Sequence, residues 1–451
     1  MKVTVQPSNL GGVLQVPASK SVMQRACAAA LISKGETLLG NPGCSADDEA
    51  ALSIITALGA TVRKQGDQLL ISSPGLHIEK PLTVDCSESG LSIRMFTPIA
   101  ACLSHAVTLT GQGSLVNRPM HFFDEVLPSL GVVVCTTQGK LPIGIQGPLR
   151  PMTIRVDGSL SSQFLTGLLF AYAAAGARDV SIYVDGLVSK PYIDLTLSVM
   201  RSFGLSCPEN KNYQEFYFGP AVASPSIAYT TVAHATDANA SLLTAPQLGQ
   251  RSRTFWVEAD WSSASFLLVA GALAGTLRLQ GLDLGSCQSD LAILQALDAA
   301  GVAYAIEAKG IVVHRSTPRA FSFDATSCPD LFPPLVALAA YAKGESLILG
   351  ANRLLHKESN RAQTLMQEFA KMGVTVLHEG DHLVVQGTGV VLGAAVSACG
   401  DHRIAMALAV AALAAVGSTE ISGAEAIKKS YPAFFADLSV LGASVSLPHF
   451  N

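Results

Sequence analysis

The sequence predicts an α/β protein of two domains, each built from three repeated units of about 70 residues. The chain of 451 residues is longer than a single hydrophobic core usually supports, which favours two domains. Apolar residues make up 49% of the chain and charged residues only 14%, against a usual level of about 25%, so most of the chain must be buried. Two short phrases also recur along the chain in one rhythm, and they define the repeated units.

The first phrase is a helical apolar run that ends at a glycine and continues as an alternating strand. A glycine in this place is the expected left-handed C-cap of a helix. The second phrase is a short strand that ends at a glycine, and it keeps the same period. Together they predict six units, each with two helices and several strands. The glycines of the first phrase are Gly59, Gly131, Gly204, Gly301, Gly373 and Gly442, and those of the second are Gly40, Gly111, Gly186, Gly281, Gly350 and Gly423.

The rhythm is irregular at one place, between the third and fourth units. Residues 220–254 lie in this interval, and they combine few charges with many Ala, Ser, Thr and Pro residues. Such a composition predicts a loop inserted at the junction of the two domains. An ordinary extra hairpin is the alternative.

Composition and motifs exclude several classes of protein. The 30 Lys and Arg against 34 Asp and Glu give no global attraction to nucleic acid or to an anionic membrane. The longest apolar run, 404–416, is too short to span a bilayer. The 9 cysteines are scattered without a CxxC motif, so we expect neither disulfides nor a protein-bound metal. The opening MKVTVQPSNL has no apolar leader, which favours a cytoplasmic location.

Polar residues open the first helix of every predicted unit. N-capping explains their Ser and Asp content. It does not explain Lys20, Arg25 and Arg403, because a cation in the first turn opposes the helix dipole. These cations therefore indicate that an anion binds there. The six helix starts are residues 18–21, 88–90, 161–163, 260–263, 328–330 and 401–403.

Basic loops follow several glycines of the second phrase. If the units share one orientation, these loops and the helix starts gather at one end of each domain and form an anion site. The set exceeds what one monoanion needs, so we expect two anionic substrates. Its candidate cations are Lys20, Arg25, Arg118, Lys357, Arg361, Arg403 and Lys429.

Two carboxylates, Asp330 and Glu358, stand among these cations in a chain that is poor in charge. They are either salt-bridge partners or a general acid and base. The chain has no GxxxxGK[ST] motif and no GxGxxG motif after a strand, which disfavours a P-loop kinase and a dinucleotide oxidoreductase.

A set of phrases in a fixed order resembles the enolpyruvyl transferase family, in its branch that acts on shikimate-3-phosphate. The phrases are LQVPASKSVMQRA, NRPM, SSQFLTGLL, GLVSKPYIDLTL, DWSSASFLL, HKESNR, GDHRIAMALAVAAL and KKSYPAFF, and the resemblance covers the chain except 220–254. It implies an inverse α/β prism of six βαβαββ repeats, three per domain. The implied domains are residues 17–254, with the insertion near a hinge, and residues 1–16 plus 255–451, which close upon the substrates.

The resemblance also implies a reaction in the shikimate pathway of aromatic amino-acid biosynthesis. The enolpyruvyl group of phosphoenolpyruvate passes to the 5-hydroxyl of shikimate-3-phosphate through a tetrahedral intermediate, phosphate leaves, and no metal or organic cofactor is needed. Asp330 would take the hydroxyl proton, Glu358 would protonate the methylene carbon, and Lys20 would contact both substrates. The residues implied to hold shikimate-3-phosphate are Ser21, Arg25, Ser161, Ser162, Ser189 and Lys357; Gln163 would bridge both ligands; and Gly90, Arg118, Arg361, Arg403 and Lys429 would surround phosphoenolpyruvate.

Some positions depart from the family pattern. Glu88, Leu91 and Met95 replace the usual Asn, Thr and Pro around Gly90, which leaves the response to the inhibitor glyphosate open, and Arg353 replaces a usual Asn. Two alternatives remain. The sister branch acts on UDP-N-acetylglucosamine, but its reactive Cys is missing from GQGSLVNRP. A non-catalytic ligand-binding relative is the other. We expect a monomer whose partners are small molecules.

Overall fold

The computed structural model describes residues 1–220, 252–355 and 357–446. The chain forms two compact α/β units, and we describe each by itself. The first unit is Ala18–Glu258, and the second unit is Met1–Pro17 with Ala259–Asn451. Most of the expected insertion at 220–254 lies outside the described residues.

Three four-stranded sheets occupy the described part of the first unit, with the orders β6-β7-β9-β8, β10-β11-β13-β12 and β14-β3-β5-β4. In each sheet the first two strands run parallel and the other pairings are antiparallel. The strands are β3 (Gly35–Gly40), β4 (Thr61–Gln65), β5 (Gln68–Ser73), β6 (Leu82–Asp85), β7 (Ala106–Thr110), β8 (Val133–Cys135), β9 (Ile143–Gln146), β10 (Ile154–Asp157), β11 (Val180–Asp185), β12 (Glu209–Lys211), β13 (Glu215–Phe218) and β14 (Ser252–Trp256).

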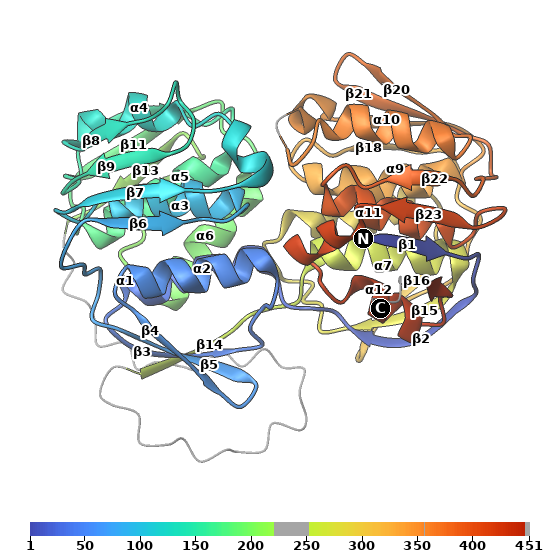
Figure 1. Ribbon diagram of the computed structural model, residues 1–451, viewed down its shortest axis with the longest axis horizontal. Helices are drawn as coiled ribbons and strands as arrows, with labels where there is room; N and C mark the ends of the chain where they lie inside the picture. Colours follow the sequence, from blue (N-terminus) through green and yellow to red (C-terminus); the bar gives the residue numbers. More distant parts are fainter. Residues whose placement is uncertain (221–251, 356, 447–451) are drawn as a thin grey trace. The chain divides into compact units, whose positions relative to one another are not determined.

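Strand β14 shifts the expected end of this unit. It pairs in parallel with β3, with Ser252 opposite Glu36 and Trp256 opposite Gly40, and Figure 1 shows β14 beside β3 and β5. The boundary expected after residue 254 falls inside this strand, and the unit instead runs to Glu258. The reason is structural, because β14 supplies the parallel partner that β6 and β10 supply in the other two sheets.

The buried helices of the first unit pack against one another. Helix α3 (Gly90–Ala100) packs on α5 (Ser162–Ala174), and α1 (Lys20–Ile32) contacts both. A Cβ atom at Gly167 would lie 2.5 Å from the carbonyl oxygen of Arg94, so only glycine permits this close approach of α5 to α3. The remaining helices are α2 (Ala46–Ala57), α4 (Phe122–Val126) and α6 (Lys190–Ser202), with the 3₁₀ turns η1 (Gly113–Asn117) and η2 (Leu127–Leu130).

The second unit contains three further sheets among its described residues, with the orders β22-β23-β1-β24, β16-β17-β15-β2 and β18-β19-β21-β20. The N-terminal segment completes two of them: β1 pairs antiparallel with β23, and β2 pairs in parallel with β15. Figure 1 shows β1 beside β23, although the two strands lie at opposite ends of the sequence. The strands are β1 (Lys2–Val5), β2 (Leu10–Gln15), β15 (Gly275–Gln280), β16 (Tyr304–Glu307), β17 (Gly310–Val313), β18 (Ser322–Asp324), β19 (Gly344–Leu349), β20 (Thr375–Glu379), β21 (His382–Gly387), β22 (Ala395–Ser397), β23 (Thr419–Ser422) and β24 (Val445–Ser446).

Three helices form the core of the second unit. Every residue of α7 (Trp261–Ala274), α9 (Phe332–Ala340) and α11 (His402–Ala412) is buried, and the three pack against one another. Helices that are apolar on all sides belong inside a domain, which explains the low charge content of the chain. The outer elements are α8 (Ile293–Ala299), α10 (Arg361–Lys371) and α12 (Phe434–Val440), with the 3₁₀ turns η3 (Ser289–Ala292), η4 (Pro329–Leu331), η5 (Ala351–Leu354) and η6 (Ala424–Lys429).

The structure confirms the local predictions on which the repeat was built. Five of the predicted polar segments directly precede or open an α-helix, and the sixth opens η4, which continues into α9. Within the described chain, the model has no helix whose length and apolar character would let it cross a bilayer. All six glycines of the first phrase have positive φ angles, at Gly59, Gly131, Gly204, Gly301, Gly373 and Gly442.

Candidate active site

Asp330 is the centre of a charged cluster in the second unit. Its Oδ1 atom accepts hydrogen bonds from Lys357 Nζ at 3.2 Å and from Arg361 Nη1 at 3.0 Å. Its Oδ2 atom accepts from Arg403 Nη2 at 3.0 Å. Three of the predicted cations therefore meet at one of the two predicted carboxylates.

Arg361 joins this cluster to two further carboxylates. Its side chain is fully buried, and Nη2 donates to Glu358 Oε2 at 2.5 Å. Its Nε donates to Asp401 Oδ2 at 2.9 Å, and Nη2 also donates to Asp401 Oδ1 at 3.2 Å. The structure thus brings together five predicted residues, namely Asp330, Lys357, Glu358, Arg361 and Arg403.

The local sequence explains why these side chains converge. Asp401 caps α11 by accepting from the backbone N–H of Arg403, which fixes the first turn that carries this arginine. Arg361 is the first residue of α10, directly after the loop that carries Lys357 and Glu358. Asp330 lies in η4, which opens α9. Helix starts and loops after strands supply the whole cluster, as the sequence predicts for one end of each domain.

The cations control the ionisation of Asp330. Burial opposes its ionisation, but the charges of Arg403, Lys357 and Arg361 outweigh burial and hold the pKa of Asp330 well below its usual value. Burial also lowers the pKa of Lys357, although Asp330 opposes that effect. In this state Asp330 and Glu358 are ion-pair partners of the cations. This is one of the two roles that the sequence left open for them, the other being general acid and base.

Two neighbours of this cluster were not among the predicted site residues, although Ser262 lies in the predicted helix start 260–263. Arg403 Nη2 also donates to Ser262 Oγ at 3.2 Å, and Ser262 donates to Asp290. Asp290 lies in η3 and Ser262 in the first turn of α7, where the serine reads as an ordinary polar residue near an N-cap. No sequence motif distinguishes Asp290, and the phrase DWSSASFLL, which contains Ser262, gives this serine no role. Lys429 ends η6, which packs against α11, and its side chain is largely buried.

Lys20 has a carboxylate partner in the first unit. It opens α1, and its Nζ lies 2.8 Å from Asp47 Oδ2 in the first turn of α2. The adjacent Asp48 belongs to a capping box with Ser45. Burial raises the pKa of Asp48 to about 6, while its hydrogen bonds from Ser45 and the charge of Lys20 act in the opposite direction. The acidic helix start SADDEA was the available signal for these two carboxylates.

Gly90, Arg118 and Gln163 are brought together by Arg94. A Cβ atom at Gly90 would lie 2.4 Å from Arg118 Nη1 and 3.4 Å from Arg94 Nη1. Arg94 Nη1 also donates to Gln163 Oε1 at 2.9 Å, and its guanidinium lies 5.1 Å from the centre of the Phe164 ring. Gly90 leaves room for both arginines, and Arg94 belongs to this cluster although the predicted set omitted it.

Arg25 is almost fully buried. Its Nε donates to Thr196 Oγ1 at 2.9 Å, and its other nitrogens donate to the carbonyl oxygens of Ser21 and Tyr192. Burial lowers the pKa of this guanidinium to about 10. Arg25 therefore ties α1 to α6, whose N-cap is Ser189.

Ser161 and Ser162 open α5 beside Gln163. Ser161 is the N-cap residue, and its Oγ accepts from the backbone N–H of Gln163 at 3.3 Å. Ser162 is buried in the first turn. Their binding role stays a prediction.

The departures from the family pattern have distinct environments. The Glu88 carboxyl group lies against Gly113 of η1, where an added Cβ would approach it to 2.3 Å. Leu91 and Met95 are buried in the apolar part of α3. Arg353 lies near Asp330 and Asp381, whose charges oppose the lowering of its pKa by burial.

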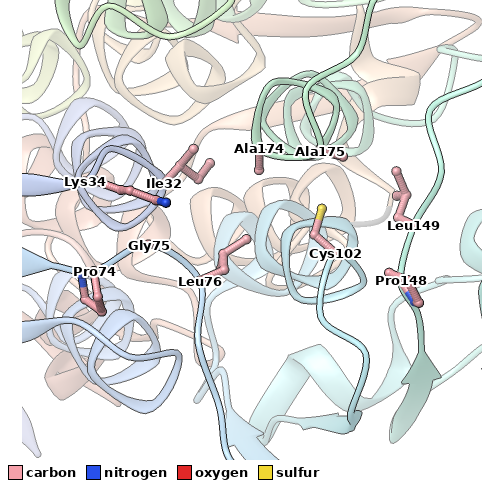
Figure 2. A pocket seen from close by; sticks show the side chains of 10 residues that line it. All are labelled: Ile32, Lys34, Pro74, Gly75, Leu76, Cys102, Pro148, Leu149, Ala174 and Ala175. Carbon is pink, nitrogen blue, oxygen red and sulfur yellow. The ribbon is translucent and has the colours of Figure 1, made fainter.

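A cavity of 440 Å³ in the first unit lies away from these residues. Figure 2 shows it bordered by Ile32 and Ala174, the last residues of α1 and α5, and by Cys102 just after α3. The predicted residues lie at the opposite ends of the same helices. Burial raises the pKa of Cys102 to about 12, so its thiol stays protonated at neutral pH. Within the described residues, no three His, Cys, Asp or Glu side chains are placed to hold a metal ion.

Known proteins match this chain along nearly its whole length. The family model described as EPSP synthase (3-phosphoshikimate 1-carboxyvinyltransferase) matches residues 4–246 and 230–438. A protein of Clostridium kluyveri named 3-phosphoshikimate 1-carboxyvinyltransferase is 35% identical over 98% of both chains. A protein of the same name from Methanocorpusculum labreanum is 34% identical over 99% of both chains.

Two solved structures share the fold. EPSP synthase from Acinetobacter baumannii superposes with a TM-score of 0.76 at 22% identity, covering 99% of this chain and 100% of that one. The enolpyruvyl transferase NikO from Streptomyces tendae gives 0.71 at 18% identity, covering 99% and 98%. From the family match and the full-length relatives it follows that this chain belongs to the EPSP synthase (3-phosphoshikimate 1-carboxyvinyltransferase) family.

Proposed function

We propose that this protein transfers the enolpyruvyl group of phosphoenolpyruvate to the 5-hydroxyl of shikimate-3-phosphate and releases inorganic phosphate. The observation that carries the proposal is the cluster around Asp330, in which two carboxylates share three buried or half-buried cations. Such a group can neutralise phosphate and carboxylate oxygens while its own carboxylates move protons. The names of the full-length relatives point to the same reaction.

The proton transfers follow from the two carboxylates. Asp330 takes the proton from the 5-hydroxyl as the hydroxyl oxygen attacks C2 of phosphoenolpyruvate. Glu358, in its protonated form, delivers a proton to the methylene carbon. These steps form a tetrahedral intermediate. Glu358, now ionised, takes a methyl proton back, and the double bond re-forms as the C–O bond to phosphate breaks. The proton held by Asp330 passes to the departing phosphate. A protonated Glu358 also loses its ion pair with Arg361, which frees that guanidinium for a substrate oxygen.

Substrate charge has a direct effect on the proposed base. Without substrate, three cations hold the pKa of Asp330 well below its usual value, and such a carboxylate is a weak base. Each cation that turns toward a substrate phosphate or carboxylate withdraws part of this stabilisation. Binding of the two anions should therefore raise the basicity of Asp330 at the moment it is needed.

The residues of the first unit have binding roles in this proposal. Lys20 contacts both substrates; Ser21, Arg25, Ser161, Ser162 and Ser189, with Lys357 of the second unit, hold shikimate-3-phosphate. Gln163, which Arg94 holds, bridges the two ligands. Gly90 and Arg118, with Arg361, Arg403 and Lys429 of the second unit, contact phosphoenolpyruvate.

The finer description of the fold belongs to the same proposal. We infer an inverse α/β prism of six βαβαββ repeats, three in each unit. The support is that each of the six sheets among the described residues has a parallel pair followed by two antiparallel pairings.

The test is the release of phosphate by the purified protein from phosphoenolpyruvate, without added metal. Shikimate-3-phosphate and UDP-N-acetylglucosamine are supplied as acceptors in separate reactions. Release with shikimate-3-phosphate alone supports the proposal. Release with the nucleotide sugar indicates the sister branch, and binding of shikimate-3-phosphate without release indicates a non-catalytic relative.

The variant Glu358→Gln tests the assignment of the acid. It should abolish phosphate release, because a general acid contributes about 10² to 10⁴ to the rate. The affinity for shikimate-3-phosphate, measured by calorimetry, should stay within about twofold of the wild-type value. Glu345→Gln is the matched control, since Glu345 is an exposed residue of β19 in the same unit. Full activity of Glu358→Gln would remove Glu358 from the mechanism.

A further inference from the structure

Asp290 has no role in the reaction as assigned above, yet one serine joins it to the charged cluster. Arg403 Nη2 donates to Asp330 Oδ2 at 3.0 Å and to Ser262 Oγ at 3.2 Å. The Ser262 hydroxyl in turn contacts Asp290 Oδ2. The guanidinium of Arg403 therefore lies between two acidic groups, one in direct contact and one reached through a hydroxyl.

The carboxylate of Asp290 faces a different element from its own. Asp290 is 1% exposed and lies in η3, whose N-cap residue is Gln288. Its Oδ1 accepts from the adjacent Ser289 Oγ at 3.3 Å, while Oδ2 faces Ser262 on α7. A buried carboxylate is costly unless hydrogen bonds or a cation compensate for the lost water, and the compensation here comes from the residues around Arg403.

Hydrogen-bond chemistry sets the direction of this chain. An arginine side chain can only donate, so Ser262 Oγ must accept from Arg403. The hydroxyl proton of Ser262 then points to Asp290, which accepts it when ionised. The ordered chain gives Arg403 Nη2 a second fixed acceptor in addition to Asp330. A neutral group at position 290 would weaken that order, because it no longer draws the serine proton as strongly.

We propose that Asp290 is a positioning residue that acts through Ser262 to hold the Arg403 guanidinium at Asp330, in the orientation that contacts phosphoenolpyruvate. This inference rests on the proposed function, because the role of Arg403 toward that substrate belongs to it. Loss of the Asp290 charge should weaken the binding of phosphoenolpyruvate more than that of shikimate-3-phosphate.

The ionisation of Asp290 offers an independent readout. Burial raises its pKa to about 6, with the charge of Asp330 acting in the same direction and Arg403 acting against it. The charged or titratable groups that face it are Asp260, Cys328, Asp330 and Arg403. Below about pH 6 the wild-type protein should therefore begin to behave like a variant that is neutral at this position.

The experiment measures both KM values by phosphate release. Asp290→Asn should raise the KM for phosphoenolpyruvate about tenfold, which corresponds to about 1.4 kcal/mol. The KM for shikimate-3-phosphate should stay within about twofold of the wild-type value. Ser262→Ala should give the same selective rise. In the double variant the two changes should add little to each other, because both break one chain. Asp298→Asn is the control, since Asp298 is an exposed carboxylate of α8 in the same unit.

The pH profile separates positioning from simple structural support. Substrate phosphates also titrate near pH 6. The informative quantity is therefore the KM of Asp290→Asn for phosphoenolpyruvate divided by the KM of the wild type at the same pH. This ratio should fall toward one between pH 7.5 and 5.5. A lower kcat with unchanged KM values, a constant ratio, or additive effects in the double variant would each overturn the inference. If Asp290→Asn does not fold, Ser262→Ala alone must still raise the KM selectively.

Failure of the inference is distinct from failure of the proposed function. A wild-type protein that releases no phosphate with shikimate-3-phosphate contradicts the proposed function itself. An active wild-type protein whose Asp290→Asn and Ser262→Ala variants keep their KM values contradicts only the role of Asp290.

Discussion

The two units differ in the groups that the cations of their sites contact. In the second unit, Lys357, Arg361 and Arg403 each contact the carboxylate of Asp330. In the first unit, Arg94 donates to an amide oxygen, and Arg25 donates to a hydroxyl and two carbonyl oxygens. Lys20 of the same unit pairs with Asp47.

This difference predicts two kinds of anion binding. An anion that enters the second unit must replace internal carboxylates, so most of its attraction to the cations is offset by ion pairs that break. An anion that contacts Arg94 competes with the amide oxygen of Gln163, whose hydrogen bond to a charged donor is weaker than that of a carboxylate. In the second unit, anion binding is therefore coupled to the loss of ion pairs that involve its carboxylates. The first unit is suited to hold a ligand in place.

The largest expected effect comes from Asp330→Asn. The variant loses the proposed base, so kcat should fall by about 10³, within the range of general-base catalysis. It also removes a shared counterion from three cations. Inorganic phosphate should therefore raise the melting temperature of the variant more than that of the wild type, as a thermal shift assay would measure.

The opposite outcome has a clear meaning. If phosphate stabilises both proteins equally, the internal carboxylate does not compete with anions, and the proposed difference between the units is wrong. Asp324→Asn is the matched control, because Asp324 is an exposed residue of β18 in the same unit.

A smaller effect is expected from the buried carboxylate beside Lys20. Burial raises the pKa of Asp48 to about 6, above the value of about 3.9 for an unfolded Asp. The stabilising contribution of the raised pKa is complete below about pH 3.9 and is lost as the pH rises through about 6. Asp48→Asn stays neutral, so relative to the wild type it should gain about 2 kcal/mol of unfolding free energy between pH 4.5 and 8.

Urea unfolding at the two pH values measures this change. Glu49→Gln provides the control, since Glu49 is an exposed residue in the same turn of α2. A difference between Asp48→Asn and wild type that stays constant with pH would show that Lys20 compensates the buried charge fully. The first unit would then resemble the second.

Much of the fold could be predicted from local signals. The helix-ending glycines need positive φ, and the N-cap residues satisfy free backbone N–H groups, so both leave marks in the sequence. The strand β14 was harder to predict, because it is separated from its partner β3 by most of the unit and follows a stretch without a clear period. Pairing between distant strands has no local signature.

The site divides in the same way. Asp330, Glu358 and their cations were predictable as rare charges at helix starts and loops. The role of Asp290 and Ser262 was not predictable, because it comes from three elements that meet in space, and the helix start at 260–263 indicates only an N-cap. Arg94 was visible in the sequence, but only its contact with Gln163 shows that it belongs to the site.

The smallest expected effect tests the first unit. Arg94 is 6% exposed and donates to Gln163, and its guanidinium carbon lies 5.1 Å from the centre of the Phe164 ring. Arg94→Lys keeps the charge but loses the planar fork, so it cannot make both contacts at once. We expect kcat/KM for phosphoenolpyruvate to fall about tenfold, or about 1.4 kcal/mol, in the phosphate-release assay.

The control separates local geometry from charge. Arg63→Lys changes an exposed residue of β4 and should keep wild-type kinetics. If Arg94→Lys also keeps them, a point charge is sufficient beside Gly90, and the neutral contacts of the first unit do not orient its cations. A loss confined to KM would instead place the role of Arg94 in ligand binding, as the comparison of the two units requires.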